Sequence, residues 1–558
     1  MTLDFARVPN LEKLIPKGCT KLSMIHASLG DLKHLILLDL SNCKCLKSLP
    51  CKIGLESLET FILSSCSKLK KFPEIVGNMS HLLELYLDGT AIEDLPLSME
   101  QLTGLIKLDL TNCKNISSLP IAICNLTSLK TLTLSGCSKL HKMEANLGNL
   151  EGLKKLDMSG MGISDLPLSM EQLTGLIKLD QTNCKNLSRL SRVPNLEKLI
   201  LKGCTKLSRI HASLRDLKHL ILLGYNNCKC LKSLPCKISW ESLEICIHSS
   251  CSKLNKLPEI VGNMSHLLEL YLDGTAIKDL PLSMEQLTGL IKLDLTNCKN
   301  LSSLPEAICS LTSLKTLTLS GCLKLDNMPM NLGNLEGLEE LDVSGTAIRE
   351  PPSSIFCLKN LKILSFQGCN GLSSKSWSWK KPLNFLLMTK TSDLMGLVLP
   401  SVSGLCSLTR LNIRYCNLQA IPSDIGSLSL LEKLDLSGNN FVLIPESINQ
   451  LSNLREFWVE NCKSLQLLPV LRSSPYIFVF ANGCTSLESL LPVNMKDYSQ
   501  NYFYLLNCFQ LVDNQGHCDL FTTMLREYFQ VSLSLSLSLS LKIMVGFYVS
   551  GIVLSRIN

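Results

Sequence analysis

One short template recurs along this chain, and it constrains the fold more than any other feature. Its clearest copy, LIKLDLTNCKNISSLP, runs from Leu105 to Pro120 and reads L-x-x-L-x-L-x-x-C-x-x-L-x-x-L-P. Copies follow one another about every 24 residues, so we count about twenty in the 558 residues. A single copy is too small to bury its own leucines, so the copies must stack and share one continuous core.

The L-x-L part of the template predicts a short strand. Side chains alternate between the two faces of a strand, so Leu108 and Leu110 are expected to point into the core. Lys107, Asp109 and Thr111 then point outward. Because every copy repeats this pattern, the sequence predicts a parallel sheet with one buried face and one open face.

The rest of the template predicts a turn and a short return segment. Cys113 follows the strand where the chain turns inward, and a small thiol fits such a buried site with weak hydrogen bonding. Pro120 fixes φ and cannot continue a strand ladder or a helix interior. From Ile121, IAICNLTSL carries apolar residues at three- and four-residue spacing, which predicts a short helical or 3₁₀ layer.

Together these features predict an α/β solenoid of the leucine-rich-repeat horseshoe type. It has a concave parallel β-sheet, a short helical or irregular convex side and about twenty repeats. Hydrophobic residues make up 46% of the chain and aromatic residues only 5%, so leucine and other aliphatic side chains must form the core.

The sequence also contains a duplication that is much longer than the short repeat. Residues 7–53 return almost unchanged as residues 192–238, an offset of 185 residues that persists through the following repeats. About eight repeats have therefore been copied as a block. Two replacements fall at core positions: Leu40 becomes Tyr225, and Leu63 becomes His248.

Breaks in the repeat suggest five segments. We predict leucine-rich repeats over residues 1–372, an insertion over 373–404, C-terminal repeats over 405–492, the start of a truncated post-repeat domain over 493–530, and a low-complexity Ser-Leu and apolar tail over 531–558.

The tail does not read as a membrane span. Its uninterrupted apolar part, residues 543–554, contains Ser550 and is short for a transmembrane helix. The alternating SLSLSLSLSL is also what a TC dinucleotide repeat encodes, so we interpret the tail as translated non-coding sequence.

Whole phrases of the sequence resemble a known class of protein. ELYLDGTAIKDLP, LTLSGCLKL, LDLTNCKNLSSLPEAIC and ENCKSLQLLP are similar to the leucine-rich-repeat region of plant intracellular disease resistance proteins of the Toll/interleukin-1-receptor, nucleotide-binding, leucine-rich-repeat class. The resemblance implies a region that senses pathogen effectors and restrains a nucleotide-binding switch.

The class's nucleotide chemistry does not carry over to this sequence. No G-x-x-x-x-G-K-[ST] phosphate loop occurs in it, so nucleotide binding and hydrolysis are not expected and no cofactor is implied. The Toll-like and nucleotide-binding parts that the class carries before its repeats are absent, which favours a truncated or partial gene product.

Outward strand positions are the candidate binding residues, because a parallel sheet presents them side by side. They become distinctive after the insertion, where tryptophan and arginine, the residues that dominate protein hot spots, stand among charges. An ordinary solvated surface with cross-strand pairs is the competing interpretation. The candidates are Arg410, Asn412, Arg414, Lys433, Asp435, Glu456, Trp458 and Glu460.

Other chemistries are weakly supported. Cys43, Cys45 and Cys51 have a spacing that a zinc site could use, but Cys43 holds the same template position as Cys113, so we predict no metal site. No catalytic set can be assembled by spacing, and we predict no enzyme activity. The net charge of +7 is small for this length and its charges are interspersed, so nucleic acid is not an expected partner.

The sequence therefore predicts a protein-recognition module of plant innate immunity. Its partner would be a pathogen effector or a guarded host protein, with a nucleotide-binding receptor domain as an alternative partner. Two other hypotheses compete with this prediction. The chain could be an adaptor or decoy fragment that acts with a full-length receptor, or a nonfunctional gene fragment. No secretory signal is present and the template lacks the G-x-I-P phrase of secreted receptors, so we expect the cytoplasm, with the nucleus as an alternative.

Overall fold

The chain divides into two compact units, Met1–Ala276 (unit 1) and Ile277–Asn558 (unit 2). The computed structural model describes residues 2–188, 193–210, 217–369, 396–469, 477–490 and 502–508, together with residues 190, 214, 215, 471 and 510. Each unit is a stack of repeats that contributes one short strand per repeat to a parallel sheet.

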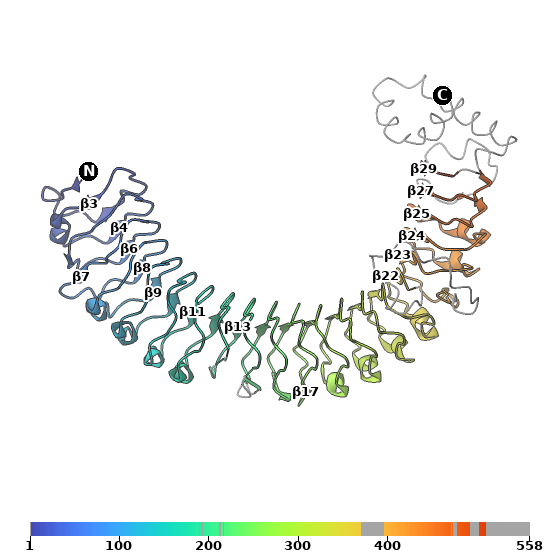
Figure 1. Cartoon of the computed structure of the whole chain (residues 1–558), viewed down its shortest axis with the longest axis horizontal. Helices are drawn as coiled ribbons and strands as arrows, with labels where there is room; N and C mark the ends of the chain where they lie inside the picture. The colour runs from blue at the N-terminus through green and yellow to red at the C-terminus, as the bar shows by residue number, and fades with distance from the viewer. Residues whose placement is uncertain are drawn as a thin grey trace, which may run out of the picture. The chain divides into compact units, whose positions relative to one another are not determined.

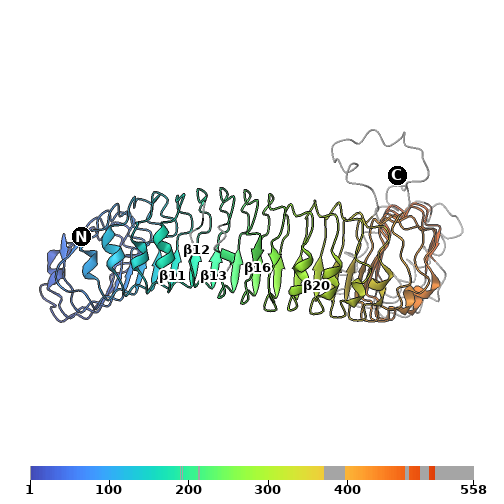
Figure 2. The same cartoon turned by 90° about the horizontal axis from the view of Figure 1, so that it is seen from below.

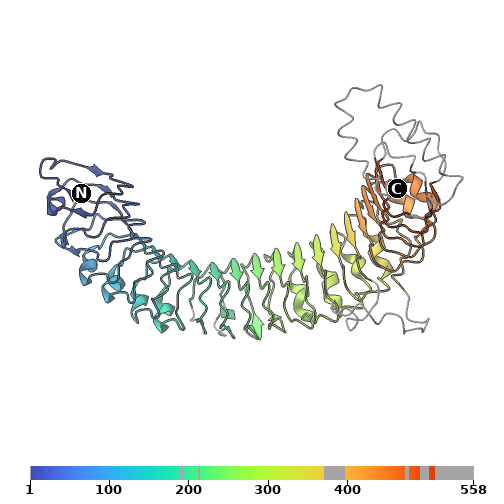
Figure 3. The same ribbon diagram turned by 45° about the horizontal axis from the view of Figure 1, so that its top comes forward.

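The sheet of unit 1 is parallel and in register, so equivalent template positions lie side by side. Lys107, Thr131 and Lys155 are direct partners on β9, β10 and β11, for example. Figure 2 shows β11, β12, β13 and β16 side by side, and Figure 3 shows the strands as a row of arrows. The strands are β2 (Lys13–Leu14), β4 (Leu37–Asp39), β6 (Thr60–Ile62), β8 (Glu84–Tyr86), β9 (Lys107–Asp109), β10 (Thr131–Thr133), β11 (Lys155–Asp157), β12 (Lys178–Asp180), β13 (Lys198–Ile200), β14 (Leu222–Gly224), β16 (Ile245–Ile247) and β18 (Glu269–Tyr271).

The sheet of unit 2 follows the same rule. β22 pairs directly with β23, so the sheet continues although 44 residues separate the two strands. The strands are β19 (Lys292–Asp294), β20 (Thr316–Thr318), β21 (Glu340–Asp342), β22 (Ile363–Ser365), β23 (Arg410–Asn412), β24 (Lys433–Asp435), β25 (Glu456–Trp458), β27 (Phe478–Phe480) and β29 (Tyr502–Tyr504).

Short 3₁₀ helices line the side of the repeats opposite the sheet (Figure 1). They are η1 (Ala27–Asp31), η2 (Leu97–Gln101), η3 (Ile121–Asn125), η4 (Leu147–Asn149), η5 (Leu168–Gln172), η7 (Leu282–Gln286), η8 (Glu306–Ser310), η9 (Leu332–Asn334), η10 (Ser353–Cys357), η11 (Ile425–Ser427) and η12 (Glu446–Gln450). Two-residue strands pair outside the main sheets: β1 (Thr2–Leu3) with β3 (Met24–Ile25), β5 (Lys52–Ile53) with β7 (Glu74–Ile75), β15 (Lys237–Ile238) with β17 (Glu259–Ile260), and β26 (Leu467–Leu468) with β28 (Ser489–Leu490).

This arrangement confirms the predicted leucine-rich-repeat fold and its alternation. Leu108 and Leu110 are completely buried, whereas Lys107, Asp109 and Thr111 are half-buried on the other face, which we call the open face of the sheet. The predicted 3₁₀ layer is confirmed as well.

Proline sets the start of many of these helices. Pro120 is the N-cap of η3 with φ −69° and ψ 147°, an extended conformation that its ring favours. Pro305 holds the same place before η8. The Leu-Pro phrase therefore marks the turn from sheet side to helix side, as predicted.

A ladder of cysteine thiols runs beside the buried leucines. The Cys137 Sγ–H donates to the Leu110 carbonyl of the preceding repeat at 3.1 Å, and the Cys322 Sγ–H donates to the Leu295 carbonyl at 3.2 Å. Burial raises the pKa of both thiols to about 12, so they stay protonated donors at neutral pH. Every cysteine in the described part of the chain is a free thiol, so the ladder acts through hydrogen bonds.

Asn439 occupies the same ladder position and shows what the thiols replace. Its Nδ2 donates to the Ile413 and Leu436 carbonyls at 2.8 and 2.7 Å. Its Oδ1 accepts from the Cys416 and Leu418 amides at 3.0 and 3.1 Å. One amide thus satisfies four buried backbone groups, whereas a thiol offers one weak donor.

We expect Asn439→Ala to destabilise unit 2 more than Cys322→Ala does. The alanine at 439 leaves the Ile413 carbonyl and the Cys416 and Leu418 amides without their side-chain partner and the Leu436 carbonyl with only the Cys462 thiol, which predicts a loss of about 3 kcal/mol, against about 1 kcal/mol for the Cys322 thiol. Urea unfolding followed by circular dichroism measures both. Asn440→Ala, at the exposed neighbouring position, is the control and should change stability by less than about 0.5 kcal/mol. Equal losses at 439 and 322 would contradict this account.

The second copy of the duplicated block carries polar rings in its core. Tyr225 and His248, which replace Leu40 and Leu63, are fully buried and stack with ring centroids 5.3 Å apart. The His248 Nε2 lies 3.2 Å from the Cys246 Sγ. The Tyr225 hydroxyl and the His248 Nδ1 have no hydrogen-bond partner among the described residues. Burial lowers the pKa of His248 from 6.5 to about 4, so its ring is neutral in the folded chain.

His248 should make its repeat acid-sensitive. An unfolded histidine takes up a proton below its ordinary pKa, whereas the buried ring does not until about pH 4. Stability is therefore unaffected above about pH 6.5 and falls between about 6.5 and 4, by about 3 kcal/mol in all. Amide hydrogen exchange of β16, corrected for intrinsic rates, should accelerate over this range relative to β6 of the first copy.

The variant His248→Leu restores the residue of the first copy and provides the control. It should remove the difference in pH dependence between β16 and β6. The same acid sensitivity in the variant would show that another group is responsible.

The repeat sheet extends beyond residue 492, where we placed its end. β29 pairs in register with β27, and the Cys508 Sγ–H donates to the Ala481 carbonyl at 3.2 Å, as a ladder cysteine does. At residues 502–508 the sheet therefore continues into the segment that we predicted to begin a post-repeat domain, and that domain stays a prediction. The predicted tail over 531–558 and most of the insertion, residues 373–395, lie outside the described residues, and the other boundaries stay predictions. Within the described ranges, the structure contains no helix with the length and apolar character that crossing a bilayer requires.

Candidate protein-binding surface

Six of the eight predicted binding residues come from three neighbouring strands of unit 2, and Arg414 and Glu460 follow two of these strands. Arg410, Lys433 and Glu456 are direct partners across β23, β24 and β25. The structure places the other five on the same open face, in two further columns: Asn412, Asp435 and Trp458 form the second, and Arg414 and Glu460 lie two residues beyond it. Arg410 is exposed and the rest are half-buried.

The carboxylates of this surface are held by neighbouring donors. The Lys433 Nζ and the Glu456 Oε1 form an ion pair at 2.7 Å across the two strands. The Asp435 Oδ1 accepts from the Ser437 amide at 2.9 Å, and the Glu460 Oε1 accepts from the Asn482 Nδ2 at 2.8 Å. Fixed charges favour specificity and orientation over raw affinity.

Arg414 is held by an aromatic neighbour. Its guanidinium lies 4.9 Å from the centre of the Tyr415 ring, and its Nη2 donates to the Tyr415 hydroxyl at 3.3 Å. This hydrogen bond raises the pKa of Arg414. The Arg414 Nε is buried and has no hydrogen-bond partner among the described residues.

Trp458 begins a stack of three aromatic rings, which we call the aromatic stack. Its ring lies 5.3 Å from that of Phe480 on β27, and Phe480 lies 4.7 Å from Tyr504 on β29. The planes are within 11° of parallel. The register of the parallel sheet produces this column, because the three residues hold the same template position on successive strands.

The aromatic stack has the properties of a protein-binding hot spot. All three rings are half-buried, so they are positioned by their neighbours but still present apolar surface. Phe478, beside Phe480 on the same strand, is 38% exposed and extends the apolar area. Glu456 and Glu460 flank Trp458 on its own strand and supply a polar border.

Sequence reasoning identified Trp458 but missed Phe480 and Tyr504. The leucine template fades after residue 470, so Phe480 was not singled out within the predicted C-terminal repeats and Tyr504 was placed outside them. The alternation in FVF and YFY was the available signal, since aromatic residues at both outward positions of a strand predict a partly exposed aromatic face.

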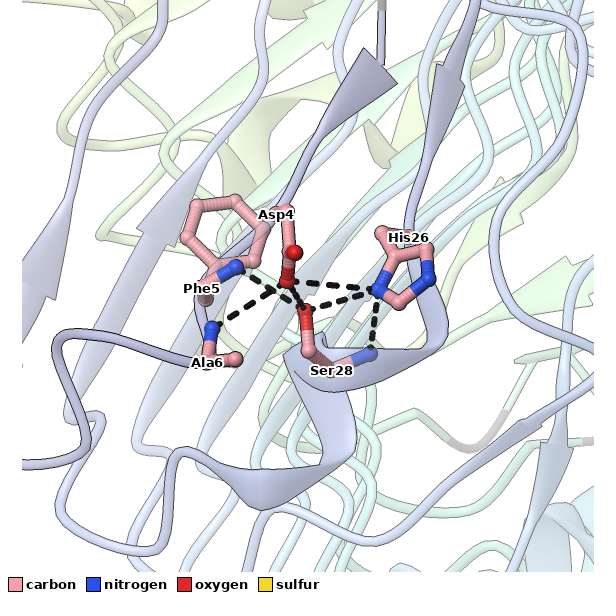
Figure 4. Close-up of polar contacts among 5 residues, drawn as sticks. All are labelled: Asp4, Phe5, Ala6, His26 and Ser28. Atoms are coloured by element: carbon pink, nitrogen blue, oxygen red, sulfur yellow. Dashed lines mark hydrogen bonds and ion pairs between the residues drawn. The ribbon is translucent and has the colours of Figure 1, made fainter.

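A serine, a histidine and an aspartate meet at the start of unit 1 (Figure 4). The Ser28 Oγ–H donates to the Asp4 Oδ1 at 2.6 Å, and the Ser28 amide donates to the His26 Nδ1 at 3.2 Å. A catalytic relay needs the histidine between the two other groups, accepting the serine proton. Here the serine hydroxyl donates to the aspartate, and the His26 Nδ1, which lies 3.0 Å from the same oxygen, accepts from the Ser28 amide, so the histidine does not lie between the other two groups.

These three residues instead cap the first 3₁₀ helix. His26 is the N-cap of η1, and the Phe5 amide donates to the Ser28 Oγ at 2.9 Å, which fastens the first strand to the helix. The hydrogen bond from Ser28 lowers the pKa of Asp4. Their separation of about 24 residues hid this cluster from sequence analysis, and the second copy carries Arg189 in place of Asp4.

Cys43, Cys45 and Cys51 do not come together as a metal site. Cys43 is buried in the ladder, where its Sγ–H donates to the Pro16 carbonyl at 3.2 Å, whereas Cys51 is exposed. Among the described residues there is no group of three histidine, cysteine or acidic side chains with a geometry suited to a metal ion.

The repeated strands, thiol ladder and 3₁₀ layer define a leucine-rich-repeat protein. Residues 54–151 and 239–328 match the family model described as Disease resistance protein RPS4B-like, leucine-rich repeats, and residues 407–428 and 430–451 match the Leucine Rich Repeat model.

The chain is similar over much of its length to plant disease resistance proteins. It is 39% identical over 307 residues to TMV resistance protein N of Nicotiana glutinosa, which covers 54% of this chain and 25% of that protein. It is 35% identical over 349 residues to Disease resistance-like protein DSC1 of Arabidopsis thaliana, covering 61% and 27%. It therefore spans about a quarter of the length of the curated relatives it matches.

Solved structures with the same kind of repeat are more distant. The leucine-rich-repeat ectodomain of the receptor kinase GASSHO1/SCHENGEN3 from Arabidopsis thaliana is 21% identical, with a TM-score of 0.34, and the match covers 89% of this chain and 68% of that one.

Proposed function

We propose that this chain is a protein-recognition module of plant immunity that binds a pathogen-derived protein on the open face of its C-terminal repeats. The aromatic stack with its charged border is the observation that carries the proposal. The similarity to disease resistance proteins supports the biological setting, and the resemblance to their intracellular class supports action in the cytoplasm or nucleus.

Binding would rest on surface complementarity. The rings of Trp458, Phe480 and Tyr504 lose their remaining exposure against the partner, and removal of such a ring from the centre of an interface typically costs at least about 2 kcal/mol. The paired charges of Lys433 and Glu456 would orient the partner, since charge pairs at a rim chiefly affect specificity and association rate.

Two related roles use the same surface with another partner. As an adaptor or decoy, the chain would hold the effector for a separate full-length receptor. As part of a longer receptor, its repeats would also contact a nucleotide-binding domain. Both roles use the aromatic stack to bind the effector. They differ in the second partner, which is a separate receptor in one role and a nucleotide-binding domain in the other.

A nonfunctional fragment is the remaining alternative. The continuous buried ladder and the satisfied cap at η1 favour a chain that folds, because each repeat closes against its neighbour with paired backbone groups. A chain that folds in this way would unfold cooperatively within each unit on heating.

Trp458→Ala should weaken binding of a cognate effector about 30-fold or more, because about 2 kcal/mol of interface energy is lost. Biolayer interferometry of the purified chain against a panel of purified effectors measures the dissociation constant. Phe480→Ala should behave similarly. Tyr86→Ala, which removes a half-buried ring from the open face of unit 1, is the matched control and should change the constant less than threefold. An effector that binds both unit 2 variants as tightly as the unaltered chain would refute the proposed surface.

A further inference from the structure

On the open face of unit 1, four aliphatic side chains surround Gly224, which lies buried among them, and the first copy of the duplicated block lacks this arrangement. Ile200, Leu222, Gly224, Ile245 and Ile247 form it, and we call these five residues the Gly224 recess. Gly224 lies in register between Ile200 on β13 and Ile247 on β16, and Leu222 lies in register with Ile245. All four aliphatic side chains are half-buried on the open face.

The glycine leaves room for a side chain from elsewhere. A Cβ built on Gly224 would meet only the Asn226 Oδ1, at 3.4 Å, within 4 Å. The backbone of Gly224 is not in the left-handed region, so the local conformation does not require glycine. Glycine weakens a strand interior and often marks a place where a ligand approaches closely. Folding alone therefore gives no reason for it here.

The first copy shows that the same backbone accepts a side chain. Asp39 corresponds to Gly224, and its Oδ1 accepts from the Ser41 amide at 2.8 Å. Thr60 corresponds to Ile245. Two replacements on the open face thus turn a polar stretch of sheet into an apolar recess, while the bounds of β14 and β16 correspond to those of β4 and β6.

Basic side chains border one side of the recess. Lys198 and Lys202, on the same strand segment as Ile200, are exposed. Lys178 is the direct partner of Lys198 on the neighbouring strand.

The nearest carboxylates on that side already accept hydrogen bonds from the chain. The Asp180 Oδ1 accepts from the Thr182 amide at 3.0 Å and from the Ser159 hydroxyl at 3.0 Å. On this side the three lysines outnumber the carboxylate of Asp180 and favour an acidic group of the partner, whereas Glu269, the direct partner of Ile245, borders the opposite side.

We propose that the Gly224 recess binds a protein segment that inserts one large apolar side chain over Gly224 and sets a carboxylate against Lys198 and Lys202. This inference goes beyond the proposed function, because it concerns another unit and another partner chemistry. An aliphatic or phenylalanine side chain would bury its surface against the four walls, and the lysines would select acidic neighbours.

The core beneath the recess is rebuilt in a matching way. Tyr225 directly follows Gly224 and points to the opposite face, where it stacks on His248, the residue after Ile247. Of the two replacements that open the recess, Gly224 thus adjoins Tyr225, whereas His248 adjoins Ile247, which both copies share. We infer that the packing of Tyr225 and His248 beneath β14 holds this strand in the sheet and so preserves the recess.

Selection of phage-displayed random dodecapeptides on the full chain tests the proposal. Enriched peptides, synthesised and titrated by isothermal calorimetry, should share a large apolar residue with Asp or Glu beside it. Gly224→Asp, which restores the residue of the first copy, should weaken their binding at least tenfold, as expected for losing the burial of one large apolar side chain. Ile245→Thr, a milder first-copy residue, should weaken it as well if Gly224→Asp perturbs folding.

Two controls separate this site from the aromatic stack. Trp458→Ala should leave these peptides bound, so failure of one site is distinguishable from failure of the other. The double variant Asp39→Gly with Thr60→Ile gives the first copy the same open-face residues as the second, including Ile15, Lys13 and Lys17 in the places of Ile200, Lys198 and Lys202. It should raise the stoichiometry from about one peptide per chain to about two.

Three results would overturn the proposal. Peptides that bind the Gly224→Asp and Ile245→Thr variants as tightly as the unaltered chain do not use the recess. A selection that enriches no acidic peptides with an apolar residue contradicts the assigned chemistry. A stoichiometry that stays at one in the double variant shows that the two replacements do not create the site.

Discussion

Burial of each repeat's leucines against the next repeat is the constraint on which the structure depends. Leu108 reaches complete burial only because neighbouring repeats cover it, and the parallel register places Leu132 beside it on β10. Ladder bonds such as that from Cys137 to the Leu110 carbonyl then satisfy backbone groups where the chain leaves the strand. A repeat without its neighbour would lose both the apolar contact and the hydrogen bonds, so local order is inseparable from stacking.

The inward half of this structure could be predicted from sequence, because it is periodic. Alternation placed Leu108 inside and Lys107 outside, and the recurring cysteine indicated a buried thiol. Non-periodic features could not be predicted in this way. The hydrogen bond between Ser28 and Asp4 depends on an aspartate that the repeat template does not specify, and the Phe480 to Tyr504 contact depends on repeats whose leucine template has faded.

The binding residues illustrate the same limit. Six of the eight candidates lie on three strands with direct register partners, because register alone brings template-equivalent positions together. Which of them hold a partner depends on side-chain pairing across strands. Lys433 with Glu456 and Arg414 with Tyr415 are set by the identity of their neighbours, and the template does not encode these identities. Periodicity therefore predicts a surface, and the structure supplies its chemistry.

The duplicated block separates the demands of folding from those of recognition. In the first copy Phe61 fills the core and packs 6.0 Å from Phe72, whereas the second copy has Cys246 and Leu257 at these places. The aromatic volume lost there is supplied by Tyr225 and His248, so the core stays filled although two of its polar atoms are left without partners. An inward exchange must be balanced in this way, because the interior is close-packed. The outward change from Asp39 to Gly224 needs no such balance, since the open face borders solvent. A stack of repeats can therefore alter its recognition surface one residue at a time while its core changes only in compensated groups.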